Sequence, residues 1–430
     1  MILVRGMRLP SVLVVAVCYC IAAVPLQDYL MIGGLSHSQL STITLLSALI
    51  LHWGLYRPLT VAPDATFWAR IAMVTALVTA TAFSSYSWQA GVDEIRRWGV
   101  ALLVGYLVVV APQHRRDVYA ILIVLCLAPI SAAVYALIQS LRGVGPAAFD
   151  IAGTAFTRAN GTIGQPNSFA GYMNGSWPLI AALTIWAHKQ RSRWRWYLTA
   201  GLGLCGIVLV LSFSRGGWFG AAVGLCTMLV VAGGVWRRVA VMVVLAACVV
   251  FAGGWRVIPG PIGVRLGSAT QIFSAPLIAR DAAQQRPDIY AAVERAMQFQ
   301  AGLDLWRRSP LIGIGPGAYT QAYPDVAYNG WWISRGHAHN AYVQIAAEQG
   351  LVGLIAYIYL LWVSTLRGYR LRTHSGILRF AAIGVCATAA AVAGHECFEY
   401  LQVNYLPVHL AAVLGLAGVL PRLVDVEDRL

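Results

Sequence analysis

The chain has 430 residues, of which 59% are hydrophobic and only 11% are charged, and its formal net charge is +14 at pH 7. A water-soluble globule needs a polar exterior, which so apolar a composition does not supply. The mean hydropathy of +0.67 agrees with this exclusion. The chain is therefore expected to be an all-α, polytopic membrane protein.

Apolar runs near the length needed to cross a hydrocarbon core of roughly 30 Å recur along the chain. They predict about twelve transmembrane helices, of which the fourth is short for a full span. The expected spans are at about 10–26, 40–56, 67–84, 99–112, 118–141, 168–187, 197–213, 217–236, 238–256, 341–366, 379–395 and 405–421. We expect transmembrane helices 1–9 in residues 1–256, a large loop domain at 257–340, and helices 10–12 in residues 341–430.

The arginine and lysine residues predict the orientation, because short loops rich in positive charge stay in the cytoplasm. Alternate loops carry the cations, and both termini are expected inside. These cations are Arg5, Arg8, Arg57, Arg70, Arg115, Arg116, Lys189, Arg191, Arg193, Arg195, Arg237, Arg238, Arg367, Arg370, Arg372, Arg379, Arg422 and Arg429. The loops at about 27–39, 85–98, 142–167, 257–340 and 396–404 then face outside.

The loop at 257–340 is the only one of these segments large enough to fold by itself, and arginine outnumbers acid in and beside it. The arginines are Arg256, Arg265, Arg280, Arg286, Arg295, Arg307, Arg308 and Arg335, and the acids are Asp281, Asp288, Glu294, Asp304 and Asp325. One interpretation is an ordinary solvated surface. The other is an anionic partner, such as lipid head groups, a diphosphate or phosphorylated sugars, which arginine binds in bidentate fashion. Nucleic acid is not expected on that side of a membrane.

Two polar segments before the loop are candidates for a binding site. Arg158 to Asn167 precedes the sixth span, where its glycines, proline and asparagines either form turns and a helix start or contribute to a site. Arg215 follows a Ser-Phe-Ser run at the tight turn between the seventh and eighth spans. An arginine at membrane depth usually marks a pathway or a bound anion, and the helix N-terminus after it offers N–H groups to a phosphate.

A glycine-rich segment from Ser309 to Tyr319 lies inside the loop. It lacks the strand and the lysine that would indicate a phosphate-binding loop, so tight turns are expected. His337, His339 and Asn340 follow, where the loop enters the tenth span. The dipole of a helix N-terminus keeps an imidazole neutral and able to accept a proton near pH 7. The alternative is that one histidine and Asn340 only cap the helix.

Acidic partners for these histidines cannot be named from the sequence. Glu348 lies nine residues after His339 and is expected to be a buried structural acid. His395, Glu396 and Glu399 cluster at the outer end of the eleventh span, where ionisable groups suggest function. Their roles stay open, although a salt link from this cluster to a loop arginine is one interpretation. No metal-ligand spacing is visible, and the eight cysteines lie almost wholly within apolar runs, so no metal site and no cofactor are predicted.

Together these motifs resemble those of bacterial lipopolysaccharide O-antigen ligases, in a superfamily that also holds O-antigen polymerases and O-linking protein oligosaccharyltransferases. The resemblance covers about residues 160–355. Its pieces are the Gly-x-x-x-x-Pro-Asn pattern from Gly161 to Asn167, Ser214-Arg215-Gly216, the Pro-Leu-Ile-Gly-Ile-Gly-Pro-Gly-x-Tyr run from Pro310 to Tyr319, His339-Asn340-x-Tyr342, and Glu348-x-Gly350-x-x-Gly353.

The resemblance implies a GT-C-like membrane glycosyltransferase in the bacterial inner membrane, with its active site facing the periplasm. It would transfer O-antigen glycan from undecaprenyl diphosphate to a sugar hydroxyl of lipid A–core, with inversion and without a metal. His339 would be the general base, and Arg158 and Arg215 would hold the diphosphate. His337, Asn340 and Asn167 would orient the base or the sugars, and membrane lipids would surround the protein.

Two other classes stay open. An O-antigen polymerase or an O-linking oligosaccharyltransferase would use the same chemistry on another acceptor. A transporter of an anionic lipid would need polar residues at mid-membrane depth and broken helices near the midplane. The expected spans are mostly Ala, Val, Leu and Gly, and their ionisable residues gather at the outer ends, which disfavours transport.

Overall fold

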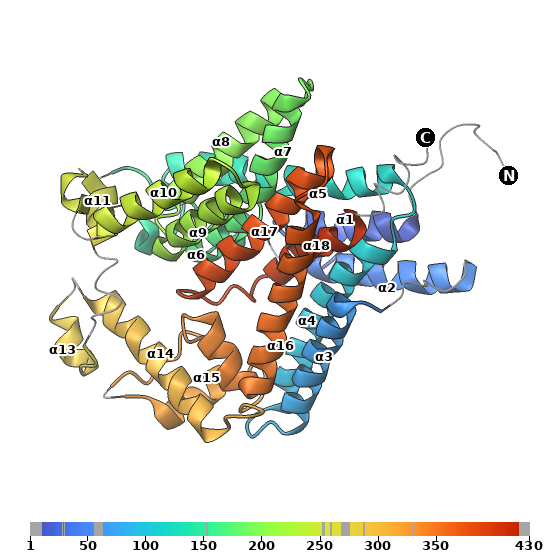
Figure 1. Ribbon diagram of the computed structural model, residues 1–430. Coiled ribbons are helices and arrows are strands. Elements are labelled where there is room, and N and C mark those ends of the chain that lie inside the picture. The colour runs from blue at the N-terminus through green and yellow to red at the C-terminus, as the bar shows by residue number, and fades with distance from the viewer. Residues whose placement is uncertain are drawn as a thin grey trace.

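The structure is a computed structural model (Figure 1) that describes residues 11–27, 29, 31–55, 63–151, 154–251, 254–258, 260–267, 276–286, 289–328 and 330–420. Some residues used to predict the orientation or the charge of the large loop lie outside the described residues. They are Arg5, Arg8, Arg57, Asp288, Arg422 and Arg429.

Within the described residues the fold is almost wholly α-helical. The longer helices are α1 (Val12–Ala23), α2 (His37–Leu55), α3 (Ala65–Ala82), α4 (Trp88–Val110), α5 (Arg115–Leu141), α6 (Pro166–Asn174), α7 (Trp177–Lys189), α8 (Arg195–Leu211), α9 (Arg215–Ala232), α10 (Trp236–Phe251), α11 (Gly260–Gly267), α14 (Tyr290–Arg308), α16 (Ala341–Leu371), α17 (Gly376–Glu396) and α18 (Leu406–Val419). The short elements are α13 (Arg280–Gln284), α15 (Tyr319–Ala322), and the antiparallel strands β1 (Met31–Ile32) and β2 (Leu35–Ser36).

A helix lies at each of the twelve expected positions, the sixth being divided into α6 and α7. Five described helices, α3, α5, α9, α16 and α17, are long and apolar enough to cross a membrane, and α1, α8 and α18 are shorter apolar helices. These helices confirm an all-α membrane protein, while the number of spans stays a prediction. The expected start of the fourth helix, at about residue 99, is wrong, because α4 begins at Trp88. The Ser87 hydroxyl caps this helix by accepting from the Ala90 N–H at 3.2 Å.

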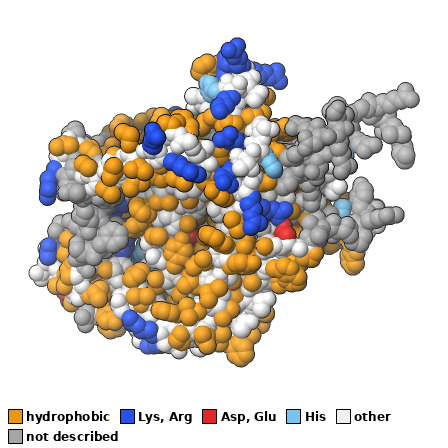
Figure 2. All heavy atoms as spheres, in the orientation of Figure 1, with side chains coloured by type: hydrophobic (Ala, Val, Ile, Leu, Met, Phe, Trp, Pro, Cys, Tyr) orange, Lys and Arg blue, Asp and Glu red, His pale blue; other side chains and the backbone are white. Residues whose placement is uncertain are grey.

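The large loop and the helix bundle meet along α16. Figure 1 shows α13, α14 and α15 grouped on one side of the bundle, with α16 running from this group into the helices. On the face shown in Figure 2, Lys and Arg side chains gather mainly along the upper edge, and hydrophobic side chains cover the band below it. Such a band is the surface that a hydrocarbon solvent requires.

Helix α17 packs closely against α9, and small residues make this possible. A Cβ atom at Gly220 would lie 2.5 Å from the Ala391 carbonyl oxygen, and one at Gly224 would lie 2.7 Å from the Ala391 Cβ. Glycine at these positions lets the two backbones approach, as is common between membrane helices. The close approach brings the C-terminal end of α17, with His395, against the start of α9 at Ser214 and Gly216.

Helix α16 is interrupted at Gly350, whose φ of 65° and ψ of −168° are not helical. The glycine-rich loop segment replaces part of the missing helical hydrogen bonding. The N–H groups of Ile314 and Gly315 donate to the carbonyls of Ala347 and Glu348 at 2.9 and 3.0 Å. The expectation that this segment forms positioning turns is confirmed, because these N–H groups bond to α16.

Glu348, beside this break, is 2% exposed, and its carboxylate accepts the Tyr319 N–H at 3.1 Å. It is therefore the buried structural acid that the sequence predicts. The buried carboxylate fastens the start of α15 to α16.

We expect Gly350→Ala to destabilise the protein. A Cβ at this position would meet the Leu311 carbonyl, and the positive φ alone costs about 1–3 kcal/mol for a residue with a side chain. Thermal unfolding in detergent, followed by tryptophan fluorescence, should show a lower Tm. Gly203→Ala is the matched control, because a Cβ there meets nothing within 4 Å. Equal Tm values for the two variants would contradict the proposed role of the break.

Candidate functional site

A cavity of about 470 Å³, here called the main cavity, lies where the large loop meets the bundle. Four of the six residues predicted for the site line it: Asn167, Arg215, His339 and Asn340. The full lining is Asn167, Ser214, Arg215, Gly216, Arg265, Leu277, Arg295, Ala296, Phe299, Gln300, Ala338, His339, Asn340, His395, Cys397, Phe398 and Glu399. The other two predicted residues, Arg158 and His337, contact members of this lining.

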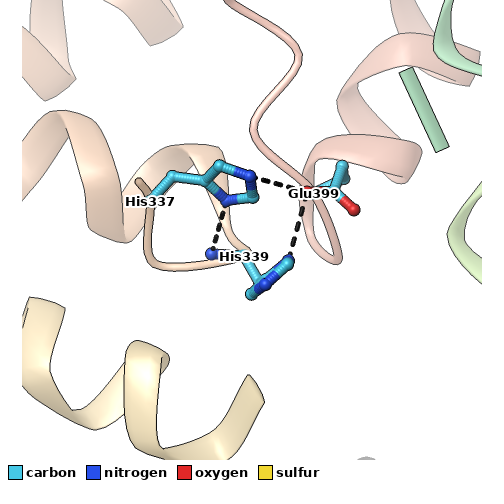
Figure 3. Close-up of side chains that lie close together, drawn as sticks. All are labelled: His337, His339 and Glu399. Carbon is cyan, nitrogen blue, oxygen red and sulfur yellow. Dashed lines mark hydrogen bonds and ion pairs between the residues drawn. The ribbon is translucent and has the colours of Figure 1, made fainter. Parts of the chain in front are cut away.

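Glu399 joins these residues into one network. Its Oε1 lies 3.2 Å from Nδ1 of His339 and 3.3 Å from Nε2 of His337, and both rings point toward it in Figure 3. Its Oε2 accepts from Nδ2 of Asn167 at 2.6 Å, and Oδ1 of Asn167 in turn accepts from Nη2 of Arg158 at 3.0 Å. The carboxylate is 5% exposed and bonded through both oxygens, so it is held in a single orientation.

These contacts assign the protons on the two imidazoles. An ionised carboxylate only accepts hydrogen bonds, so the ring nitrogens facing Glu399 carry hydrogen. Nδ1 of His337 accepts the backbone N–H of His339 at 3.1 Å, which makes His337 the neutral Nε2–H tautomer. His339 then carries its proton on Nδ1, and its Nε2 becomes the basic atom of the ring.

The charge state of the network follows from burial and neighbours. Burial lowers the pKa of His337 from its ordinary value of 6.5 to about 4, so this ring is neutral at pH 7. Burial also disfavours the ionised form of Glu399, but His339, His337 and Arg295 outweigh it and hold the pKa of this carboxyl below its usual range. Glu399 is therefore the fixed negative charge beside the two rings.

The backbone holds His339 in an unusual conformation. Its φ is 53°, in the left-handed region that costs a residue with a side chain about 1–3 kcal/mol. Asn340 supports this turn: its Oδ1 caps α16 by accepting the Val343 N–H at 2.9 Å, and its Nδ2 donates to the Cys397 carbonyl at 2.9 Å. The capping interpretation is thus confirmed for Asn340, while the His339 side chain contacts Glu399.

Arginines from separate elements also line the main cavity. Arg215 is the first residue of α9, whose cap is the Ser214 hydroxyl, which accepts the Gly217 N–H at 3.2 Å. A cation at a helix N-terminus is electrostatically unfavourable. Arg265 and Arg295, from the large loop, add two more positive charges to the same lining. An anion bound between them would reverse this unfavourable arrangement.

Arg158 and Arg265 both hold the turn before α9. Nε of Arg158 donates to the Ser212 carbonyl at 2.8 Å, and Nε of Arg265 donates to the Phe213 carbonyl at 3.0 Å. Burial, together with repulsion by Arg265 and Arg295, lowers the pKa of Arg158 to about 9. Burial and repulsion by Arg295 lower the pKa of Arg265 to about 10. The cluster therefore stays cationic at pH 7 and favours an anionic ligand.

Sequence reasoning missed three residues of this site: Glu399 as a partner of the histidines, and Arg265 and Arg295 as cavity residues. The sequence did not name an acidic partner for His337 and His339, and in the structure Glu399 contacts both. The spans indicated only that the start of the tenth and the end of the eleventh lie on the same membrane side. Which side chains meet there depends on how α16 and α17 pack.

Glu396 and His395, the two ionisable residues that lie just before Glu399 in the sequence, have different surroundings. Glu396 is buried in the bundle, where it accepts from the Tyr357 hydroxyl at 2.7 Å and from Nε2 of Gln402 at 2.6 Å. His395 lines the main cavity and lies 3.5 Å from the Ser214 hydroxyl and 3.4 Å from Nδ2 of Asn174. Glu396 thus stabilises the bundle, and His395 supports the turn that carries Arg215.

His337, His339 and Glu399 could also hold a metal ion, although the sequence predicts no metal. One ligand atom from each lies within 4.8 Å of the others, and imidazole with carboxylate suits a zinc ion. A metal would have to replace the hydrogen bonds that Oε1 of Glu399 now accepts from both rings. Measuring activity with and without a chelator distinguishes a metal-bound site from the hydrogen-bonded one.

The neutral state of His337 predicts how stability depends on pH. Its folded pKa lies below the unfolded value, so between about pH 6.5 and 4 the unfolded chain binds more protons and stability falls with falling pH. We expect His337→Gln to reduce this dependence, measured as Tm in detergent from pH 8 to 4. His374→Gln, at an exposed position, should keep the wild-type profile. A His337→Gln profile as steep as the wild type would refute the buried neutral state.

Comparison with known proteins adds an independent assignment. Residues 200–358 match the family model described as O-antigen ligase. The matched region contains Arg215, Arg265, Arg295 and both histidines of the site, and Glu399 lies beyond its end. A search of the curated proteins returned no match. Over residues 200–358 the chain is therefore similar to the O-antigen ligase family.

Proposed function

We propose that the protein is an O-antigen ligase, a glycosyltransferase that moves glycan from undecaprenyl diphosphate to a sugar hydroxyl of lipid A–core. The reaction would take place at the periplasmic face of the bacterial inner membrane. One observation carries the proposal: His339, oriented by Glu399, lines the same cavity as Arg215, Arg265 and Arg295. A base and a cationic cluster in one cavity suit a transfer that releases a diphosphate.

In the proposed reaction the acceptor hydroxyl attacks the anomeric carbon from the face opposite the diphosphate. Nε2 of His339 takes the hydroxyl proton as the new C–O bond forms. The bond from the anomeric carbon to the diphosphate breaks, and undecaprenyl diphosphate leaves with the electron pair, so the configuration inverts. Glu399 stabilises the imidazolium that forms on His339.

The arginines would act on the leaving group. Arg215, Arg265 and Arg295 line the cavity and would bind the diphosphate, offsetting the charge that develops as it leaves. Arg158, which the resemblance casts as a second diphosphate ligand, contacts Asn167 and the Ser212 carbonyl. We therefore assign Arg158 a positioning role. His337 and Asn340 would orient His339, and Asn167 would orient Glu399.

The acceptor is the part of the proposal that rests most on the family assignment. An O-antigen polymerase or an O-linking oligosaccharyltransferase could use the same base and arginines. Transport is disfavoured, although α16 is broken as transport would require. The backbone groups that the break leaves without helical partners bond to the large loop. For example, the Leu351 N–H donates to the Pro310 carbonyl at 2.8 Å. The break is therefore satisfied by contacts within the protein.

The first test is glycan transfer from undecaprenyl diphosphate to lipid A–core by the full chain in detergent with EDTA. We expect transfer by the wild type, and a loss of about 10²–10⁴-fold in rate for His339→Gln and for Glu399→Gln, since each removes or disables the base. Glu294→Gln, in a loop ion pair with Arg335, is the matched control and should keep the activity.

Other products of this assay would point elsewhere. Longer glycan on the donor without capped core would identify a polymerase, and the absence of any covalent product would favour transport. Loss of transfer in EDTA, restored by zinc, would show that the two histidines and Glu399 hold a metal.

A second test concerns the cationic cluster. We expect Arg215→Gln to raise the Kd for undecaprenyl diphosphate by roughly ten- to a hundredfold, because a hydrogen bond to a charged group contributes about 1.5–3 kcal/mol. Binding should also weaken as salt is added. Exposed Arg193→Gln is the control and should leave the Kd unchanged. An unchanged Kd for Arg215→Gln would remove the arginine from the donor site.

A further inference from the structure

A second cavity, of about 290 Å³ and here called the hairpin pocket, lies on elements that do not form the main cavity. Its walls come from the β1–β2 hairpin, from the starts of α2 and α18, and from the middle of α4. The lining is Gln27, Ser36, Ser38, Gln39, Thr42, Arg96, Arg97, Val100, Gln402, Val403, Asn404, Tyr405, Pro407 and Val408. Nothing in the proposed transfer step uses these residues.

The connection between α17 and α18 links the two cavities. Residues 395 and 397–399 contribute to the main cavity, and residues 402–405, 407 and 408 contribute to the hairpin pocket. Gln402 also bonds to Glu396 at the end of α17, at 2.6 Å. The two cavities are thus separate in their walls but lie along one short segment, as expected for two parts of one large substrate complex.

The polar wall of the hairpin pocket is already ordered. The Ser36 N–H donates to Oε1 of Gln39 at 3.0 Å, and the Gln39 N–H donates to the Ser36 hydroxyl at 3.3 Å. The hydroxyls of Ser36 and Ser38 lie 2.8 Å apart. Amides and hydroxyls held in this way can donate to and accept from sugar hydroxyls without a large loss of entropy.

Two arginines give the hairpin pocket an anion-binding side. Arg97 pairs with the buried Glu94, and Arg96 lies 3.6 Å from Asp93. Their side chains are 48% and 61% exposed. A guanidinium has five N–H donors, so an ion pair through one nitrogen leaves others for a phosphate.

The rim of the hairpin pocket holds backbone strain. Asn404 and Tyr405 are consecutive and have φ values of 52° and 59°, in the left-handed region. The Tyr405 hydroxyl lies 2.9 Å from the Ser41 hydroxyl, which fastens this turn to α2. Strain of this kind persists where surrounding contacts impose it, often at ligand sites.

The surface below the pocket is suited to acyl chains. After Ser38 and Thr42, helix α2 exposes the side chains of Ile43, Leu46 and Ile50, which are 51%, 49% and 71% exposed. A polar, arginine-bearing pocket above an exposed apolar helix face matches an amphiphile with a phosphorylated head group. A free sugar phosphate would make no use of this face.

We propose that the hairpin pocket binds a phosphorylated sugar in the head group of the acceptor glycolipid, with its acyl chains along α2. This inference rests on the proposed function, since it needs a second anionic glycolipid beside the donor. The arginine cluster of the main cavity would hold the diphosphate of the donor, and the hairpin pocket would hold the acceptor. The two substrates then occupy different cationic sites and do not compete.

Native mass spectrometry of the full chain tests this proposal by counting bound lipid A–core, the same lipid after dephosphorylation, and phosphatidylglycerol. Two variants probe the pocket in different ways: Arg96→Gln removes a cation, and Ser38→Phe fills the space. Arg142→Gln, an exposed cation at the end of α5 and outside both linings, is the control. Both pocket variants should weaken binding of phosphorylated lipid A–core by about fivefold or more.

The other ligands separate the explanations. Dephosphorylated lipid should be insensitive to Arg96→Gln but sensitive to Ser38→Phe, and phosphatidylglycerol should be insensitive to both. An equal loss of phosphatidylglycerol binding in these variants would show a general site for anionic lipids and overturn the proposal. Unchanged binding of lipid A–core in both variants would overturn it as well.

Kinetics distinguish a failure of this proposal from a failure of the proposed function. In the transfer assay, Arg96→Gln should raise the KM for lipid A–core and leave kcat and the KM for the donor unchanged. An unchanged KM for the acceptor in an active enzyme would overturn the assignment of the pocket alone. Absence of transfer by the wild type would refute the ligase function, and the binding measurements would still decide what the pocket holds.

Discussion

The buried carboxylate of Glu399 is the interaction on which the site depends. It accepts from His339, His337 and Asn167, and Asn167 extends the contact to Arg158. An ionised carboxylate is stable at 5% exposure because these groups replace its hydration. Removing any one of them would leave a buried charge partly unsatisfied. Substitutions in this network are therefore expected to alter the position of His339.

The rest of the fold sets the distance between Glu399 and His339. His339 is on the α16 side and Glu399 follows α17, so the packing of these two helices sets their distance. The break at Gly350 and its hydrogen bonds to the glycine-rich segment tie the large loop to α16. The same loop carries Arg265 and Arg295 to the main cavity. The proposed base and the cationic cluster are thus positioned by the junction of loop and bundle.

The charge distribution has a simple physical logic. Burial, and then repulsion by neighbouring arginines, lowers the pKa values of Arg158 and Arg265, so gathering these cations has an electrostatic cost. A multiply charged anion bound between the arginines would offset their repulsion and be held by all of them. Two cationic sites with separate walls, the main cavity and the hairpin pocket, would allow two anionic glycolipids to bind at once. This is the arrangement that a transfer between two membrane-bound substrates requires.

The sequence by itself determined the all-α membrane class, the positions of most helices, and Arg215, His339 and Asn340 as candidate site residues, because these follow from hydropathy and from local motifs. Only the tertiary structure decided the partner of His339, the place of Arg265 in the cavity, and the indirect position of Arg158. These depend on contacts between residues far apart in the chain. Helix packing sets such contacts, and hydropathy carries no information about which faces meet.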